Sequence, residues 1–180
     1  MVIVLMGVAG SGKTTIGKLL AERLGWPFRD ADDFHSPQNL DKMRRGIALD
    51  DGDRRPWLEA IRASIIKSLS SNENAIYACS ALKRGYRQIL SPDPNRVKFV
   101  YLKGSSTLIG DRLAKRTGHF FDPALLPAQF KDLQEPTDAL GVDISSSPAS
   151  IADRIVASLG LSELIDQRLL GTAQQRQKNP

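Results

Sequence analysis

The sequence predicts an α/β domain in three layers, with helices covering both faces of a parallel sheet of about five strands. Two observations lead to this prediction. Short apolar runs, typical of strands buried on both faces, alternate with segments whose apolar residues recur at helical spacing. In addition, the glycine-rich stretch GVAGSGKT, Gly7 to Thr14, stands between the first apolar run and the first helical pattern.

The length and composition set the expected number of domains. With 180 residues, 41% of them hydrophobic, the chain can form one domain with a substantial core and leaves no obvious room for a second. We expect a single domain over residues 1–170. Residues 171–180 include the polar segment TAQQRQKNP, which has nothing to bury, and are predicted to form a disordered tail.

The glycine-rich stretch follows a predicted strand, Met1 to Met6, and precedes a predicted helix, Thr14 to Leu24. In that context the pattern G-x-x-x-x-G-K-[ST] predicts a loop whose backbone N–H groups turn inward on a phosphate at a helix N-terminus. Lys13 would reach the β- and γ-phosphates, and Thr14 would ligate Mg²⁺. The alternatives are a glycine-rich turn with a chance lysine and a dinucleotide site, although G-x-G-x-x-G is absent. The expected nucleotide contacts of the loop are Gly7, Val8, Ala9, Gly10, Ser11, Gly12, Lys13, Thr14 and Thr15.

Acidic residues close the second predicted strand. This short strand follows Gly25 and Trp26-Pro27-Phe28 and ends in Arg29-Asp30-Ala31-Asp32-Asp33. The carboxyl ends of parallel strands line the ligand crevice of open α/β sheets, so both Asp30 and Asp32 could face the nucleotide. We expect Asp30 to orient Mg²⁺ and Asp32 to hold the hydroxyl of an acceptor. A solvated acidic turn is the alternative.

Two helices are predicted next. Ser36 and Pro37 match an N-cap and a first helical residue, and Gly46 would end this short helix. Pro56 is likewise predicted as a first helical residue, followed by an apolar face from Trp57 to Leu69. Trp57 is more typical of a core than of a ligand platform.

The third predicted strand, Ala75 to Cys79, is informative because no Asp or Glu closes it, as a motor ATPase would require. An Asn-Lys-x-Asp guanine signature is also missing. The strand runs instead into a basic stretch that contains Lys83 and Arg84. Together with the phosphate loop and the two aspartates, this pattern indicates phosphoryl transfer to a small acceptor, with arginines neutralising the transferring group.

The remainder of the chain predicts strands at 97–102 and 141–145 and helices at 105–116 and 151–159. Arg112 and Arg116 lie one turn apart on one helix face, which is either solvated or directed at a ligand. Between these elements, residues 117–136 contain two helix starts, Asp122-Pro123 and Leu126-Pro127. Short helices in such an excursion are consistent with a mobile helical lid over the nucleotide.

Charge and cysteine usage exclude several classes of protein. The net charge of +5 arises from Lys and Arg interleaved with 20 acidic residues, so no continuous basic stripe for nucleic acid exists, and an anionic small substrate explains the excess equally well. The single cysteine, Cys79, is expected in the core and fits a reducing compartment. The first apolar run is too short for a signal peptide or a membrane span. We expect a cytoplasmic protein with no membrane or nucleic-acid partner; a nucleic-acid-binding NTPase is the alternative from another class.

Five motifs in order extend this interpretation: GVAGSGKT, DADDFH with Asn39 and Lys42-Met43, LDDGDRRPWL, CSALKRGYR with VYLKG, and RTGHFFDPALLPAQFKDLQEP. Together they resemble the gluconokinases of the small-kinase phosphate-loop group, from Met1 to about Leu159. The chain departs from that family in having proline at Pro37 instead of directly after His35, and Ala48 where proline is frequent. These departures concern loop geometry more than chemistry.

The resemblance implies a shikimate-kinase-like P-loop kinase fold, a homodimer, and transfer of phosphate from ATP to the 6-hydroxyl of D-gluconate. It also implies that Arg112 and Arg116 flank adenine and phosphates, so that Lys13, Asp32 and Arg116 form the catalytic set. Shikimate kinase or a nucleotide kinase is the alternative enzyme. The residues implied to lie near the acceptor, besides Asp32, are His35, Arg54, Lys83, Arg84 and His119.

Which basic side chain holds the carboxylate stays open at this point. Arg54 is favoured, because the fork of a guanidinium suits a carboxylate. For His35, a loop histidine bonded to backbone is as good an interpretation as a ligand contact.

Overall fold

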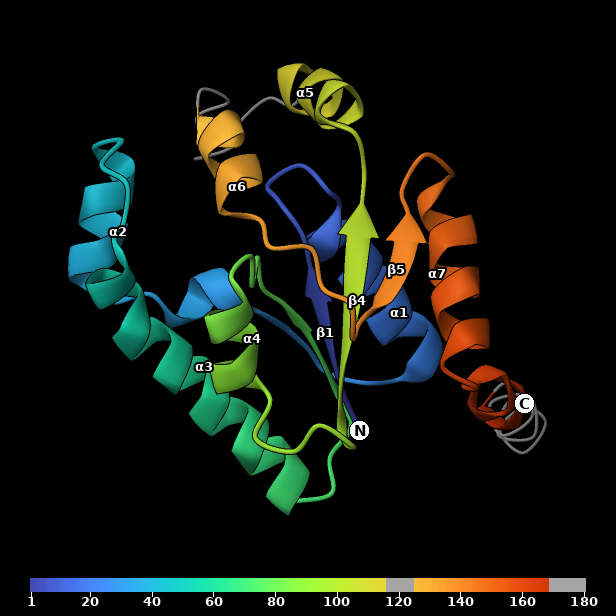
Figure 1. The fold of residues 1–180 in the computed structure, drawn as a ribbon. Helices are drawn as coiled ribbons and strands as arrows, with labels where there is room; N and C mark the ends of the chain where they lie inside the picture. The colour runs from blue at the N-terminus through green and yellow to red at the C-terminus, as the bar shows by residue number, and fades with distance from the viewer. Residues whose placement is uncertain (116–124, 169–180) are drawn as a thin grey trace, which may run out of the picture.

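A five-stranded parallel sheet forms the centre of the protein (Figure 1). The computed structural model describes residues 1–115 and 125–168. All neighbouring strands run parallel in the order β2-β3-β1-β4-β5, which confirms the predicted fold class. The strands are β1 (Val2–Met6), β2 (Phe28–Asp30), β3 (Ala75–Ala78), β4 (Val97–Lys103) and β5 (Leu140–Asp143).

Helices cover both faces of this sheet, with α3 and α4 on one side and α1 and α7 on the other (Figure 1). The helices α5 and α6 lie beyond the carboxyl ends of the strands, where a ligand crevice is expected. Residues 162–168 are also helical. The bounds are α1 (Lys13–Leu24), η1 (a 3₁₀ turn, Ala31–Phe34), α2 (Pro37–Arg44), α3 (Asp51–Ser70), α4 (Arg84–Leu90), α5 (Ser106–Ala114), α6 (Leu126–Asp132) and α7 (Pro148–Ser158).

The continuous apolar sequence of β1 follows from its position at the centre of the sheet. All five of its residues are buried, because side chains that alternate along a strand enter two different cores. Ile3 and Leu5 pack into the core shared with α1 and α7. Val2, Val4 and Met6 pack into the core shared with α3. The sheet is therefore held by one hydrophobic core on each face.

The prediction for the start of α3 is wrong. The helix begins at Asp51 rather than at Pro56, which lies inside it. A reciprocal cap explains the difference, since the Asp53 N–H donates to Asp50 Oδ1 at 2.8 Å and the Asp50 N–H donates to Asp53 Oδ2 at 3.2 Å. These two bonds satisfy backbone N–H groups at the N-cap and in the first turn, so the helix begins before the proline. No element was predicted for the basic stretch after β3, and the structure shows that its part from Arg84 onward forms the helix α4.

Other helix starts agree with the sequence. Ser36 caps α2 by accepting from the Asn39 N–H, and Pro37 is the first residue of that helix. The predicted start at Leu126-Pro127 opens α6. The Asp122-Pro123 start and the tail over 171–180 lie outside the described residues. Within the described part of the chain, no helix combines the length and apolar character needed to cross a bilayer.

Candidate active site

The phosphate loop connects β1 to α1 and depends on its glycines. Gly12 caps α1 with φ +94°, and Gly10 has φ +79°, in the left-handed region that favours glycine. A Cβ on Gly10 would lie 2.8 Å from Cγ of Leu113, so a side chain would also collide with α5. The sequence pattern therefore produces the tight turn that a phosphate cradle requires.

The Lys13 ammonium and the Ser11 hydroxyl are polar side-chain groups of the phosphate loop. The Lys13 ammonium donates to the carbonyls of Gly7 and Val8, both at 3.0 Å. Ser11 is buried, and its hydroxyl has no hydrogen-bond partner among the described residues. A buried hydroxyl and an inward-facing backbone fit a loop built to receive phosphate oxygens.

Thr14 and Asp30, the two predicted magnesium ligands, are in contact. The Thr14 hydroxyl donates to Asp30 Oδ2 at 2.9 Å. This bond connects the start of α1 to the end of β2. Among residues 1–115 and 125–168, no cluster of three or more His, Cys, Asp or Glu side chains could hold a metal. One carboxylate and one hydroxyl fit Mg²⁺, because that ion is usually held by one or two protein oxygens together with substrate phosphates and water.

Asp32 lies in the 3₁₀ turn η1 after Asp30 and is held differently. Its backbone N–H donates to Asp30 Oδ1 at 3.2 Å, while its side chain is 75% exposed at the open side of the cleft. The pKa of Asp32 is nevertheless raised, first by desolvation between the cleft walls and then by the charge of Asp30, against smaller effects of His35 and Lys13. A raised pKa makes the carboxylate a better proton acceptor.

His35 stacks on Trp57, with ring centroids 4.6 Å apart and planes 4° from parallel. Trp57 is fixed in turn, since its indole N–H donates to the Ala31 carbonyl at 2.7 Å. Trp57 is buried in the core, as predicted, and it also lines the cleft. Burial lowers the pKa of His35, whose Nδ1 is buried without a partner among described residues and whose Nε2 lies 4.0 Å from Asp32 Oδ1. The lowered pKa favours a neutral imidazole beside Asp32.

Arg54 points into the same cleft from the N-terminal part of α3. Its guanidinium donates to the Tyr86 hydroxyl at 3.1 Å and lies 3.8 Å from Asp132 Oδ2. Behind it, Asp51 accepts from the Tyr86 hydroxyl and from the Lys83 ammonium, the latter at 2.7 Å. This network fixes the position of Arg54 between three helices.

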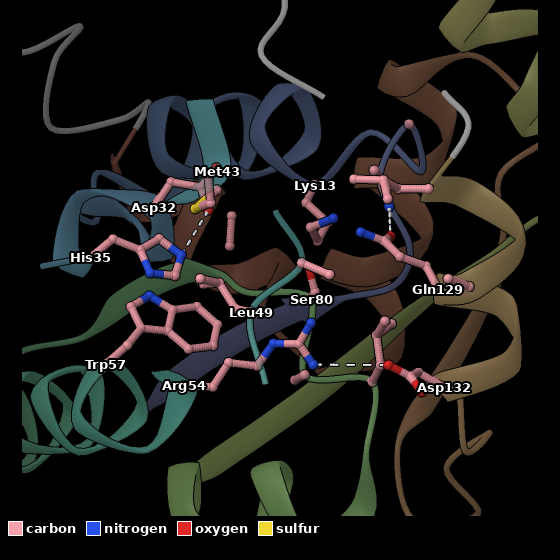
Figure 2. Close-up of a pocket in the computed structure, with 18 of the residues that line it drawn as sticks. Lys13, Asp32, His35, Met43, Leu49, Arg54, Trp57, Ser80, Gln129 and Asp132 are labelled. Carbon is pink, nitrogen blue, oxygen red and sulfur yellow. Dashed lines mark hydrogen bonds and ion pairs between the residues drawn. The ribbon is translucent and has the colours of Figure 1, made fainter. Parts of the chain in front are cut away.

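Most of these residues line one cleft of about 400 Å³ at the carboxyl ends of the strands (Figure 2). That volume suits a small molecule rather than a polymer. One wall is the phosphate loop and the opposite wall contains Arg54 and Trp57. The predicted residues that line it are Ala9, Gly10, Gly12, Lys13, Thr14, Asp30, Asp32, His35 and Arg54.

Five basic residues of the predicted site are placed elsewhere or are not described. Lys83 is paired with Asp51 behind the cleft wall, and Arg84 lines a second cavity near β4. Arg112 donates to the Ile144 carbonyl at 2.6 Å. Arg116, His119 and the first part of the predicted lid lie outside the described residues.

Among the cleft residues that the sequence interpretation did not assign to the site are Gln129 and Asp132, which project from α6. They are three residues apart and therefore share one face of a helix whose start was predicted. That spacing of polar residues was the available signal. The interpretation assigned their segment to a lid but named only His119 within it.

Cys79 takes no part in the chemistry of this site. It is buried at the end of β3, and desolvation raises its pKa to about 12. A thiol with such a pKa is not a nucleophile at neutral pH, which agrees with its predicted place in the core.

Comparisons with known proteins agree with this geometry. A family model described as shikimate kinase matches residues 9–159. A gluconokinase of Arabidopsis thaliana is 45% identical over 170 residues, which cover 86% of this chain and 90% of that protein. Among solved structures, a gluconokinase from Sinorhizobium meliloti is 40% identical with a TM-score of 0.76, covering 94% of this chain and 95% of its own.

A sugar kinase from Janibacter sp. is similar as well, with 38% identity and a TM-score of 0.83, over 91% of this chain and 96% of that structure. The relatives are matched over most of their length, and the residues that the family model matches, 9–159, include both aspartates, Arg54 and the phosphate loop from Ala9 onward. The chain therefore belongs to the gluconokinase family of P-loop kinases.

Proposed function

We propose that this protein transfers the γ-phosphoryl group of ATP to the 6-hydroxyl of D-gluconate, giving 6-phospho-D-gluconate and ADP. Family membership supports the ATP-dependent phosphorylation of gluconate. The observation that carries the assignment of roles is the shared cleft. It places the phosphate loop, Asp32 and Arg54 around one volume of about 400 Å³.

The nucleotide would bind with its phosphates on the loop. Lys13 would exchange its two carbonyl partners for β- and γ-phosphate oxygens. Thr14 and Asp30 would hold Mg²⁺, which, when bound, supplies positive charge that stabilises the phosphates during transfer. Closure of the lid over 117–136 is proposed to bring Arg116, which directly precedes it, onto the same phosphates, and Arg112 is proposed to lie near the adenine.

Asp32 would accept a hydrogen bond from the attacking hydroxyl and receive its proton late in the transfer. A loose transition state needs alignment of the nucleophile more than early deprotonation. The raised pKa of Asp32 suits the acceptance of that proton, and the stacked His35 limits the space in which the carboxylate can turn. Asp32 would therefore orient the attacking hydroxyl first and accept its proton afterwards.

Arg54 is proposed to bind the gluconate carboxylate. Of the described arginines it is the one that lines the cleft, and its guanidinium can form two parallel hydrogen bonds with a carboxylate. Lys83 would act through Asp51 and Tyr86 to hold the network around Arg54. His119 is proposed to contact the acceptor from the lid.

A panel of acceptors with ATP and Mg²⁺ tests the assignment. We expect turnover of D-gluconate in clear preference to shikimate and to nucleoside monophosphates, and a product phosphorylated at carbon 6 by ³¹P and ¹³C NMR. Preference for shikimate or for a nucleotide would overturn the proposal in favour of another small-acceptor kinase. Hydrolysis stimulated by RNA or DNA and indifferent to gluconate would instead support a nucleic-acid-dependent NTPase.

We also propose that the protein is a cytoplasmic homodimer without membrane or nucleic-acid partners. The resemblance to gluconokinases supports the dimer, and the interleaved charges support the absence of a polymer partner. Sedimentation of the purified protein at several concentrations tests the oligomeric state.

A further inference from the structure

One helix, α6, contacts both halves of the cleft at the same time. Its Gln129 side chain accepts a hydrogen bond from the Ala9 N–H of the phosphate loop at 2.6 Å. One turn later, Asp132 lies 3.8 Å from the Arg54 guanidinium. Figure 2 shows the two side chains directed at opposite walls. A single short helix therefore links the nucleotide half of the cleft to the acceptor half.

The chemistry of each contact matches that of the substrate expected there. The amide oxygen of Gln129 takes a backbone N–H of the kind that a phosphate loop offers to phosphate oxygens. The carboxylate of Asp132 faces the arginine that would bind a substrate carboxylate. Each residue thus presents the same type of acceptor atom as the substrate group that it faces.

We propose that α6 is an internal occupant of both subsites, with Gln129 in the place of a phosphate oxygen and Asp132 in the place of the acceptor's carboxylate. The part concerning Asp132 rests on the proposed function, and the part concerning Gln129 requires only nucleotide binding. Each substrate must displace its own mimic. Both contacts therefore lower the affinity of the site for the first substrate that arrives.

Displacement also couples the two subsites. Gln129 and Asp132 share one face of one helical turn, so a movement of α6 that releases one contact strains or releases the other. Beyond α6 the chain is tethered, because the Gln134 N–H donates to the Leu82 carbonyl at 3.0 Å. Binding of nucleotide then makes Arg54 more accessible, and binding of the acceptor makes the Ala9 N–H more accessible. Each substrate therefore raises the affinity for the other, and by the same factor.

The proposal and the alternative, in which Gln129 only contacts bound nucleotide, predict opposite effects of removing the Gln129 side chain on substrate affinity. If Gln129 only bound nucleotide, its removal would weaken nucleotide binding. If it is an internal competitor, its removal strengthens binding of the first substrate. A neutral hydrogen bond accounts for about three- to tenfold in affinity, and a partly exposed ion pair for about two- to fivefold.

Isothermal titration of purified variants tests the nucleotide arm. The probe is a non-hydrolysable ATP analogue with Mg²⁺, in the absence of acceptor. We expect Gln129→Ala to bind it about three- to tenfold more tightly than the parent protein. Gln134→Ala is the matched control, because the Gln134 side chain accepts from the Arg84 N–H at the same distance, 2.6 Å, outside the central cleft. Unchanged or weaker binding by Gln129→Ala would overturn the proposal.

D-Gluconate alone is the probe for the acceptor arm. We expect Asp132→Asn to bind it about two- to fivefold more tightly, while Glu135→Gln, which loses an ion pair with Lys103 outside the cleft, is unchanged. The increase in gluconate affinity caused by the ATP analogue should also become smaller in Gln129→Ala. If the parent protein binds no gluconate, the proposed function fails while the nucleotide arm still decides the role of Gln129. Gluconate binding to Asp132→Asn that is equal to the parent's or weaker would overturn the role of Asp132.

Discussion

Replacement of Asp32 by Asn should lower the catalytic rate without lowering the stability of the fold. Asn keeps the size of the side chain but loses its charge and its ability to accept a proton. Removal of a positioned acid–base group lowers kcat by roughly 10²- to 10⁴-fold, or about 3–5 kcal/mol in the barrier. Because Asp32 does not bond to Thr14, whereas Asp30 does, the affinity for ATP and the requirement for Mg²⁺ should change little.

The same substitution should not weaken the fold. The pKa of Asp32 is raised in the folded protein, so its ionised form disfavours folding at pH above that pKa, and this penalty disappears as the pH falls. Asn removes the penalty at neutral pH. Since the side chain is 75% exposed, its repulsion by Asp30 is screened, and we expect Tm to rise by only roughly 1–3 °C.

A coupled assay of ADP formation and a thermal melt measure the two effects on one preparation. Asp33→Asn is the matched control, because Asp33 is an exposed acid of the same turn outside the cleft lining. In the parent protein, kcat/KM should fall on the acid side at a pH above the ordinary pKa of an aspartate. Near-normal turnover of Asp32→Asn, or its rescue by excess Mg²⁺, would refute the role assigned to this carboxylate.

Three further outcomes are expected. Lys13→Ala should lower turnover by orders of magnitude with unchanged circular dichroism, and a folded variant with normal activity would show that the loop is not the phosphate site. Asp30→Asn should raise the concentration of Mg²⁺ needed for half-maximal activity, because Thr14 would lose its carboxylate neighbour. Cys79 should react with a thiol reagent only after unfolding, since it is buried with its pKa raised to about 12; modification of the native protein would contradict its place in the core.

The sequence specified the sheet and the phosphate loop well because each depends on local signals. The continuous apolar run of β1 indicates directly that the strand is buried on both faces. The glycines are required by the backbone angles of the loop. The contact between Thr14 and Asp30 was anticipated only in part. Sequence placed both at the carboxyl ends of strands, but the pairing depends on β2 lying at the sheet edge beside the start of α1.

The parts that sequence did not predict depend on competing local signals or on distant contacts. Pro56 is a strong start signal, yet the reciprocal cap of Asp50 and Asp53 begins α3 five residues earlier. Gln129 and Asp132 carry no motif of their own. Their spacing indicates only a shared helix face, and their importance arises from where α6 lies relative to the phosphate loop and α3.

The earlier start of α3 also has a functional consequence, since it makes Arg54 a helical residue. In a loop, a long cationic side chain would lose considerable conformational entropy each time it bound a carboxylate. Here the capped first turn fixes its backbone, and Tyr86 fixes its guanidinium. Asp53 strengthens the arrangement, because it joins the cap to α2 through an ion pair with Lys42 at 2.7 Å. The residue that closes the helix cap therefore also holds in place the arginine that we propose binds the substrate carboxylate.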